Sequence, residues 1–232
     1  MAAHATTGPV AHAPAAAHPP TSMGLPHLKL GFWTFLGSDC LFFGSLIATY
    51  MAYRGHSLTG PYSHTSWTAS DGHVVKHILN VPVTSISAFV LLVSSFAMVM
   101  ALNGFQTNNR GRARLWIFLT AIFGLTFLGF QSFEFTEFYL NGLSLSQNLF
   151  GSTFFVLTGF HGTHVAFGVL WLLTLFVADL RKPIPPSKAI NVETCGLYWH
   201  FVDIVWIVIF TVVYLIPSPH LSRPPVPPLQ IR

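Results

Sequence analysis

The chain has 232 residues, of which 52% are hydrophobic and only 8% are charged, and its formal net charge is +4. Because an average soluble domain has about 25% charged residues, this composition excludes an ordinary soluble globular protein and indicates a membrane protein. The positive charge lies between apolar runs, which points to membrane topology and lipid headgroups, and no nucleic-acid partner is expected.

Residues 1–28 are rich in Ala, Pro, Thr and His. They lack the basic region and the continuous apolar core of a cleaved signal peptide, so we expect a disordered N-terminal segment. His4, His12 and His18 are candidate metal ligands, but histidines scattered through a Pro-rich segment favour disorder. Residues 217–232 form a second Pro-rich segment, which we expect to be a tail.

Five apolar runs lie between residues 29 and 216, and each is long enough to cross a hydrocarbon core of roughly 30 Å. Backbone polar groups in lipid must be paired within the structure, which leaves helices or closed barrels. The runs do not alternate polar and apolar residues, so helices are favoured over barrel strands. We predict an all-α bundle with five transmembrane helices, at about Lys29–Tyr53, Pro82–Phe105, Leu115–Tyr139, Ser152–Leu180 and Thr194–Ile216.

Basic residues that flank the spans predict the orientation, because Lys and Arg accumulate on the cytoplasmic side. Seven lie on one side and four on the other, and the segment Arg110–Arg114 forms a short predicted loop, where the rule is strongest. We therefore expect a cytoplasmic N-terminus and an external C-terminus. The seven are Lys29, Arg110, Arg112, Arg114, Arg181, Lys182 and Lys188, and the four are Arg54, Lys76, Arg223 and Arg232.

Asp39 lies near the middle of the first predicted span. A charged Asp at a helix centre costs roughly 2.5 to 3.5 kcal/mol on insertion scales, so something must compensate for it. Its own helix offers only Phe and Leu on the neighbouring turns, and burial without a counter-charge favours the neutral, protonated carboxyl. We expect this buried carboxyl to have a proton or assembly role, and the alternative is an interhelical hydrogen bond that only aids packing.

The later spans carry polar residues at helical spacing. On the third, Gln131 and Glu134 share a face, and on the fourth His161 and His164 share a face, so that one of the histidines could reach Glu134. A row of small residues on the fourth span favours close approach of another helix. That row consists of Thr158, Gly162 and Ala166.

The fifth span carries His200 and Asp203 three residues apart, a spacing that allows an ion pair or hydrogen bond within one helix. A heme or metal held between His161 and His200 is an alternative, but the two histidines are offset along the membrane normal. Cys40 and Cys195 show no ligand spacing, so no metal site is predicted. We interpret six residues as a structural polar network between the third, fourth and fifth helices: Gln131, Glu134, His161, His164, His200 and Asp203.

Four sequence blocks carry a resemblance that covers about residues 29–216. They are FLGSDCLFF from Phe35, QSFEF from Gln131, GSTFFVLTGFHGTHV from Gly151 and YWHFVDIVW from Tyr198. These blocks resemble subunit III of the heme-copper respiratory oxidases, which include cytochrome c oxidase and its quinol-oxidising relatives. The last two blocks are highly specific.

The resemblance implies an accessory subunit of a proton-translocating terminal oxidase, a complex that reduces oxygen to water. It implies contact with catalytic subunit I, which such a subunit stabilises while supporting proton uptake, and also with subunit II, further small subunits and phospholipids. Heme and copper are expected on the partner subunits, with no cofactor, metal or catalytic residue on this chain. By resemblance, Asp39 occupies the family's buried carboxyl position.

Long family members have seven helices, whereas no apolar span precedes Lys29 here. Asp39 and the five predicted helices are similar to the bacterial quinol-oxidase form, so we expect the inner (plasma) membrane of a bacterium. These residues do not separate cytochrome c from quinol as the electron donor. Two other classes remain open, a transporter or proton channel that uses Asp39 and Glu134, and a membrane heme protein.

Overall fold

The structure is a computed structural model and describes residues 27–54, 56, 67–68, 74–75, 79–146 and 148–216. Most of the predicted N-terminal segment and the whole predicted tail lie outside these residues. Five helices, each long and apolar enough to cross a membrane, confirm the predicted all-α class and the number of spans. They are α1 (His27–Tyr53), α2 (Val81–Gln106), α3 (Arg110–Leu140), α4 (Leu149–Arg181) and α5 (Ile190–Phe210).

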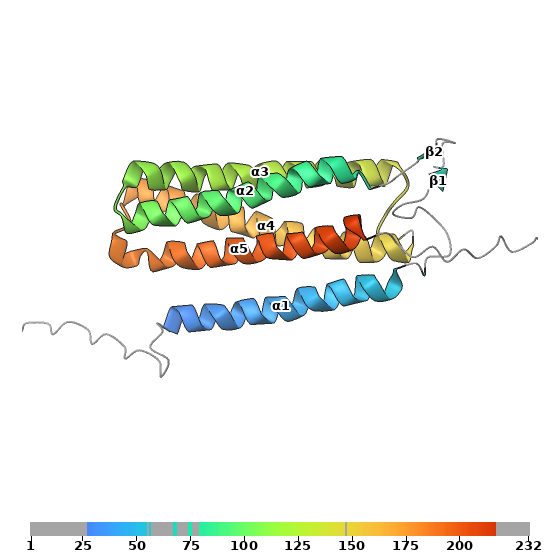
Figure 1. Cartoon of the computed structure of the whole chain (residues 1–232), viewed down its shortest axis with the longest axis horizontal. Coiled ribbons are helices and arrows are strands. Elements are labelled where there is room, and N and C mark those ends of the chain that lie inside the picture. Colours follow the sequence, from blue (N-terminus) through green and yellow to red (C-terminus); the bar gives the residue numbers. More distant parts are fainter. Residues whose placement is uncertain are drawn as a thin grey trace, which may run out of the picture.

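Helices α2 to α5 form an up-and-down bundle, and α1 lies along one side of it (Figure 1). α1 packs mainly on α4 and α5, and it is the least buried span, whereas α5 is the most buried. In the connector from α1 to α2, the short strands β1 (Trp67–Thr68) and β2 (Val74–Val75) pair antiparallel. The 3-10 turn η1 (Pro186–Lys188) precedes α5, and α5 continues into a π-helix, η2 (Thr211–Leu215).

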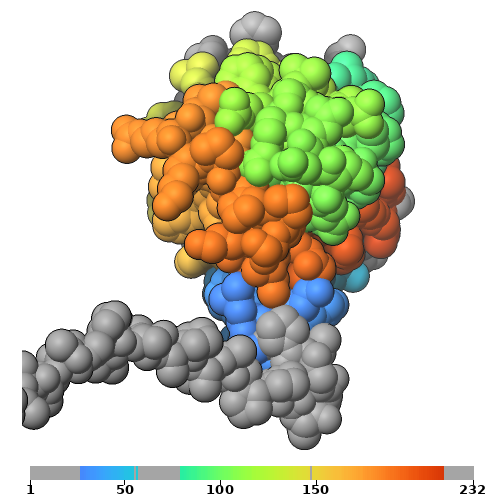
Figure 2. All heavy atoms as spheres, turned by 90° about the vertical axis from the view of Figure 1, so that its left-hand side faces the viewer, coloured from blue at the N-terminus to red at the C-terminus, as the bar shows by residue number. Residues whose placement is uncertain are grey.

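The two ends of the bundle differ in charge. One end holds the start of α1, the α2–α3 turn and the connector from α4 to α5, and we call it the basic end. Figure 2 looks onto this end, where the first turns of α3 lie beside residues 181–190 and above the start of α1. The opposite end, where η2 finishes, is called the C-terminal end.

The helices extend beyond the predicted spans, most clearly at the start of α3. The prediction of a loop from Arg110 to Arg114 was wrong, because the helix begins at Arg110. Asn109 caps this helix, and its side chain accepts a hydrogen bond from the backbone N–H of Arg112 at 3.2 Å. Arginine side chains are long enough to leave the apolar region, so a membrane helix can carry them at its end.

Small residues allow the helices to approach one another closely. A Cβ atom at Gly104 would lie 2.7 Å from the backbone nitrogen of Ala113, so glycine lets α2 and α3 meet beside their turn. Gly124 likewise makes room for the indole of Trp199, because a Cβ at this position would lie 2.5 Å from the ring. The indole nitrogen of Trp199 donates to Ser94 Oγ at 2.8 Å, so its buried N–H is satisfied.

Candidate functional site

Asp39 faces His164 across the contact between α1 and α4. Oδ2 of Asp39 lies 3.7 Å from Nε2 of His164, and the two side chains are 14% and 18% exposed. The other ring nitrogen, Nδ1 of His164, lies 2.7 Å from the backbone oxygen of Phe160. Because a carbonyl oxygen only accepts, Nδ1 carries a proton and Nε2 is the nitrogen that faces the carboxyl group. α4 therefore supplies Asp39 with an ionisable neighbour that its own helix does not offer.

Aromatic rings surround this pair. The ring of Phe43 lies 4.9 Å from that of His164, and the ring of Phe42 lies 6.3 Å away. The hydroxyl of Tyr198 on α5 donates to the backbone oxygen of His164 at 2.9 Å. The pair therefore lies where α1, α4 and α5 meet, in surroundings of low polarity where electrostatic interactions are strong.

Glu134 is buried near the C-terminal end of α3, with 3% exposure. Its Oε1 is hydrogen-bonded to the hydroxyl of Thr84 on α2. The prediction that His161 or His164 would reach Glu134 is not what the structure shows, because α3 presents Glu134 to α2. The histidines face other helices: His164 meets Asp39, and His161 meets Trp206.

Gln131 joins α3 to α4. Its Nε2 donates to the backbone oxygen of Thr158 at 2.7 Å, and a Cβ at Gly162 would lie 2.5 Å from its Oε1. Thr158 and Gly162 therefore form the predicted close contact. Ala166 does not take part, since it is exposed, and the buried face of α4 continues instead through Gly168.

His200 and Asp203 on α5 meet Ser95 of α2. Ser95 Oγ donates to Oδ2 of Asp203 at 2.7 Å, and Nδ1 of His200 lies 3.2 Å from the same Oγ. Because Ser95 has one proton to donate, its oxygen accepts from a protonated Nδ1 of His200. The predicted pair within α5 is therefore a cluster of three residues that ties α5 to α2.

His161 is fully buried in an aromatic cage. Its ring stacks on Trp206 at 4.8 Å, and the ring of Phe127 meets it edge-on at 5.7 Å. Neither ring nitrogen of His161 has a hydrogen-bond partner among the described residues. Since His200 contacts Ser95, the two histidines serve separate contacts, and this arrangement fits packing better than a pair of heme ligands.

The six predicted polar residues therefore belong to separate contacts, which link α1 to α4, α2 to α3, α3 to α4, α4 to α5, and α2 to α5. Within the part of the chain that the structure describes, no group of three or more His, Cys, Asp or Glu side chains is arranged to hold a metal ion. What these clusters can do is fix the positions of neighbouring helices and hold protons on buried acids.

Asp179 is a buried acid that the sequence analysis missed. It is 0% exposed at the basic end, and it accepts hydrogen bonds from Nε of Arg114 at 2.7 Å and Nη1 of Arg110 at 3.1 Å. The backbone N–H of Ile184 adds a third bond at 2.7 Å, so α3, α4 and the connector to α5 are joined at one carboxylate. The sequence does hold a signal for this contact, because an acid at the end of an apolar run requires a partner, and Arg110 and Arg114 lie four residues apart at the start of another run.

Lys29 at the start of α1 forms a second ion pair at the basic end. Its Nζ lies 2.6 Å from Oε1 of Glu193 on α5, and the two side chains are 25% and 33% exposed. Such a partly exposed pair contributes little to stability, but it fixes the start of α1 beside α5.

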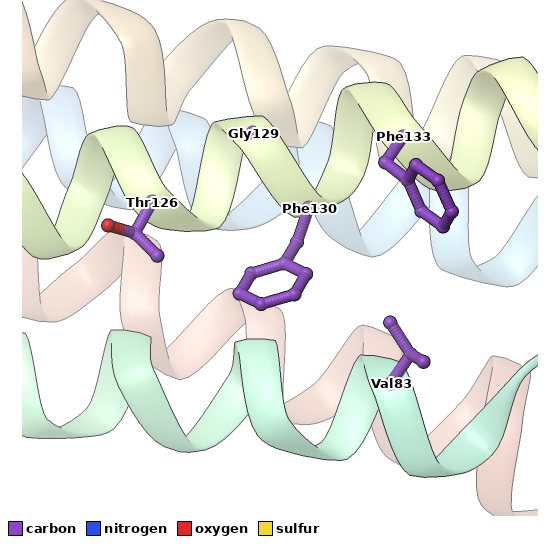
Figure 3. A pocket seen from close by; sticks show the side chains of 5 residues that line it. All are labelled: Val83, Thr126, Gly129, Phe130 and Phe133. Atoms are coloured by element: carbon purple, nitrogen blue, oxygen red, sulfur yellow. The ribbon is translucent and has the colours of Figure 1, made fainter.

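A groove of about 500 Å³ lies between α2 and α3 near the C-terminal end (Figure 3). Phe130 of α3 points toward α2, and the hydroxyl of Thr126 is bonded to the backbone oxygen of Ile122 at 2.9 Å. The described residues that line this groove are mainly apolar, so it is suited to apolar contact. Its lining consists of Val83, Thr126, Gly129, Phe130 and Phe133.

The comparison with protein families decides between the classes that the sequence left open. The family model of cytochrome c oxidase subunit III matches residues 16–218. The chain belongs to the cytochrome c oxidase subunit III family. The clusters described above are thus features of a subunit III, a protein that associates with other oxidase subunits.

Curated relatives of this subunit III agree with the assignment. Cytochrome c oxidase subunit 3 of Bacillus sp. (strain PS3) is 37% identical over 186 residues, which cover 80% of this chain and 84% of the relative. Cytochrome bo(3) ubiquinol oxidase subunit 3 of Pseudomonas aeruginosa is 35% identical over 185 residues, covering 80% and 83%. Probable quinol oxidase subunit 3 of Staphylococcus saprophyticus is 33% identical over 188 residues, covering 81% and 88%. Relatives named for both donors thus occur at similar identity.

Proposed function

We propose that this subunit III is an accessory subunit of a proton-translocating bacterial heme-copper oxidase, where it stabilises catalytic subunit I and supports proton uptake. The match to the family model over residues 16–218 is the observation that carries the proposal. The fold supports it, since Asp39, Glu134 and Asp203 each contact a neighbouring helix of the same chain.

In this proposal heme and copper lie on partner subunits, and this chain holds no redox centre. The contacts of two histidines support that view, because His161 packs on Trp206 and His200 contacts Ser95. Oxygen reduction to water is then a property of the complex, in which this chain has no catalytic residue. Subunits I and II, further small subunits and phospholipids are the proposed partners.

We place the chain in the inner membrane with its basic end in the cytoplasm. That end holds seven basic residues against the two acids Asp179 and Glu193, and basic residues favour the cytoplasmic side. The N-terminus is then inside, and η2 finishes at the outer surface. Labelling of a cysteine introduced at Arg112 tests the orientation, because a reagent that cannot cross the membrane is expected to reach it only from inside.

Asp39 and His164 are the groups through which we propose that the subunit supports proton uptake. With Nδ1 of His164 donating to Phe160, a neutral imidazole presents a lone pair to the carboxyl group across 3.7 Å. Two acceptors that face each other in a place of low polarity repel, so the pair is favoured with one proton between them. A role restricted to assembly is the alternative for Asp39.

Deletion of the subunit from the oxidase tests the proposal. We expect the hemes to remain, with a normal visible spectrum, and the enzyme to lose activity in fewer turnovers than the complete complex. Proton pumping is expected to weaken as well. An oxidase that lacks this chain and still matches the complete enzyme in turnover-dependent inactivation and in pumping would contradict the proposed function.

A further inference from the structure

Four polar side chains from four different helices meet at the C-terminal end of the bundle. They are Tyr50 of α1, Thr84 of α2, Glu134 of α3 and Tyr214 of η2, and none is more than 3% exposed. A convergence of buried polar groups inside an otherwise apolar bundle is costly unless their hydrogen bonds are satisfied. The need to satisfy these groups therefore leaves few possible arrangements of the protons in this cluster.

Thr84 is the centre of the cluster. Its hydroxyl contacts Oε1 of Glu134 and lies 3.0 Å from the backbone oxygen of Asn80, and the side chain of Tyr214 lies beside it. A threonine hydroxyl donates one hydrogen bond and accepts two. If Thr84 donates to the Asn80 carbonyl, which only accepts, then Glu134 must donate to Thr84 and must carry a proton. The second lone pair of the Thr84 oxygen can then accept from the neighbouring hydroxyl of Tyr214.

The other solution has an ionised Glu134 that accepts the single proton of Thr84. It places a negative charge in a site where the neighbouring groups are hydroxyls, and a buried carboxylate needs a cation or several donors. The titratable groups that face the site are Tyr50 from α1 and Tyr214 from η2, while Glu137, one turn along α3, adds further negative charge. The protonated solution is the favoured one.

Residues of α4 and the end of α1 surround the cluster. α4 contributes Phe150 and Phe154, whose rings lie 6.3 Å from Tyr50 and 6.4 Å from Tyr214 respectively. Arg54, just after α1, lies beside Tyr50 and donates to the backbone oxygen of Ile216. That arginine ties the end of α1 to the end of η2 and so closes the site.

Two further observations are typical of a functional site. The hydroxyl of Tyr50 is buried, interacts electrostatically with Tyr214, and has no hydrogen-bond partner among the described residues. In addition, Tyr214 lies on a π-helix, closed by the bond from the N–H of Ile216 to the oxygen of Thr211 at 3.0 Å. π-Helical turns are rare and occur frequently at functional sites. Here the turn carries the tyrosine that lies beside Thr84.

We propose that Glu134 is a second proton-binding site of this subunit, separate from Asp39, and that it holds one exchangeable proton. The neutral acid donates to Thr84, and the hydroxyls of Tyr214 and Tyr50 extend the cluster toward Arg54 at the C-terminal end of the bundle. This inference goes beyond the proposed function and does not depend on it. A subunit that proved irrelevant to oxidase lifetime would still show the proton on Glu134.

Infrared difference spectroscopy on the purified oxidase complex tests the inference, because a protonated carboxyl group absorbs apart from an ionised one. The spectrum of the wild type minus that of Glu134→Gln is expected to contain one protonated-carboxyl band that shifts in D₂O. Glu137→Gln is the matched control, and it is expected to keep that band. Thr84→Val removes the acceptor, so the band is expected to move to higher frequency.

The inference is overturned if Glu134→Gln leaves every protonated-carboxyl band in place, or if it removes a carboxylate band instead. A measurement without mutation covers the case in which the variants do not fold. The full chain contains only three glutamates, Glu134, Glu137 and Glu193, of which Glu134 alone is buried. With carbon-13 in the glutamate side chains of the purified chain, a shifted protonated-carboxyl band supports the inference, and its absence contradicts it.

Discussion

Asp39 on α1 and His164 on α4 face each other across 3.7 Å, near the middle of the two spans. Their contact is important for α1, since this helix packs mainly on α4 and α5. The same two side chains thus attach the most exposed helix to the bundle and form an ionisable pair inside it. Variants at this position can separate the two roles.

Asp39→Asn is expected to keep α1 in place, because the uncharged amide has nearly the same shape and offers a donor to the side that faces Nε2 of His164. The variant cannot release a proton, so proton uptake by the oxidase is expected to slow while assembly stays complete. Proton uptake during turnover and subunit content measure the two effects. Full assembly with unaltered uptake would remove Asp39 from the functional residues and leave it a packing role.

Asp179→Asn is expected to destabilise the basic end strongly. Asp179 is fully buried, and the substitution removes the negative charge that pairs with Arg110 and Arg114. Loss of one partner from a buried ion pair costs about 3 kcal/mol. Thermal unfolding in detergent measures the change. Arg112→Gln is the control, since Arg112 is exposed and α3 directs it away from Asp179, and it is expected to leave the midpoint unchanged.

Ser95→Ala is expected to loosen the contact between α2 and α5. Asp203 and His200 both lose their partner on α2, and a buried polar group left without a hydrogen bond costs about 1 to 3 kcal/mol. Ser85→Ala on the same helix is the matched control, because the Ser85 hydroxyl is exposed and bonds only to the oxygen of Val81, at 2.7 Å. Equal unfolding temperatures for the two variants would disprove the role of Ser95.

Gly162→Ala is expected to separate α3 from α4. Its Cβ would lie 2.5 Å from Oε1 of Gln131, and overpacking of this kind costs roughly 1 to 3 kcal/mol. Gly159→Ala places the same methyl group where no atom lies within 4 Å, and alanine favours helix, so that variant is expected to be neutral or slightly more stable. Unfolding midpoints compare the pair, and a loss in Gly159→Ala as large as that in Gly162→Ala would argue against the close contact.

The spans were predictable because lipid imposes a minimum length of apolar helix, and hydropathy records it directly. The predicted helix start at Leu115 was wrong, since arginines at a helix end add charge without ending the helix. The sequence also shows which acids need a polar partner, because a carboxyl group within a membrane span is costly without one. These acids are Asp39, Glu134 and Asp203.

The partners themselves were not predictable. Helical spacing places His161 and His164 on one face, but it does not say which helix that face meets. Thr84 and Ser95 went unnoticed because α2 carries no ionisable residue, and hydroxyls in membrane helices commonly bond to their own backbone. Only the packing of α2 against α3 and α5 shows that these two hydroxyls bind buried acids.

Purification of the tagged chain from native membranes in mild detergent is the most direct test of the central claim, that this chain works as a subunit III within an oxidase. The visible redox spectrum and mass spectrometry of the co-purifying proteins are the two readouts. The account predicts that a heme-copper subunit I co-purifies, with heme absorbance and oxygen-consuming activity. A chain that arrives alone would contradict it, and pigment in that preparation would indicate a heme protein, whereas a colourless one would favour a transporter.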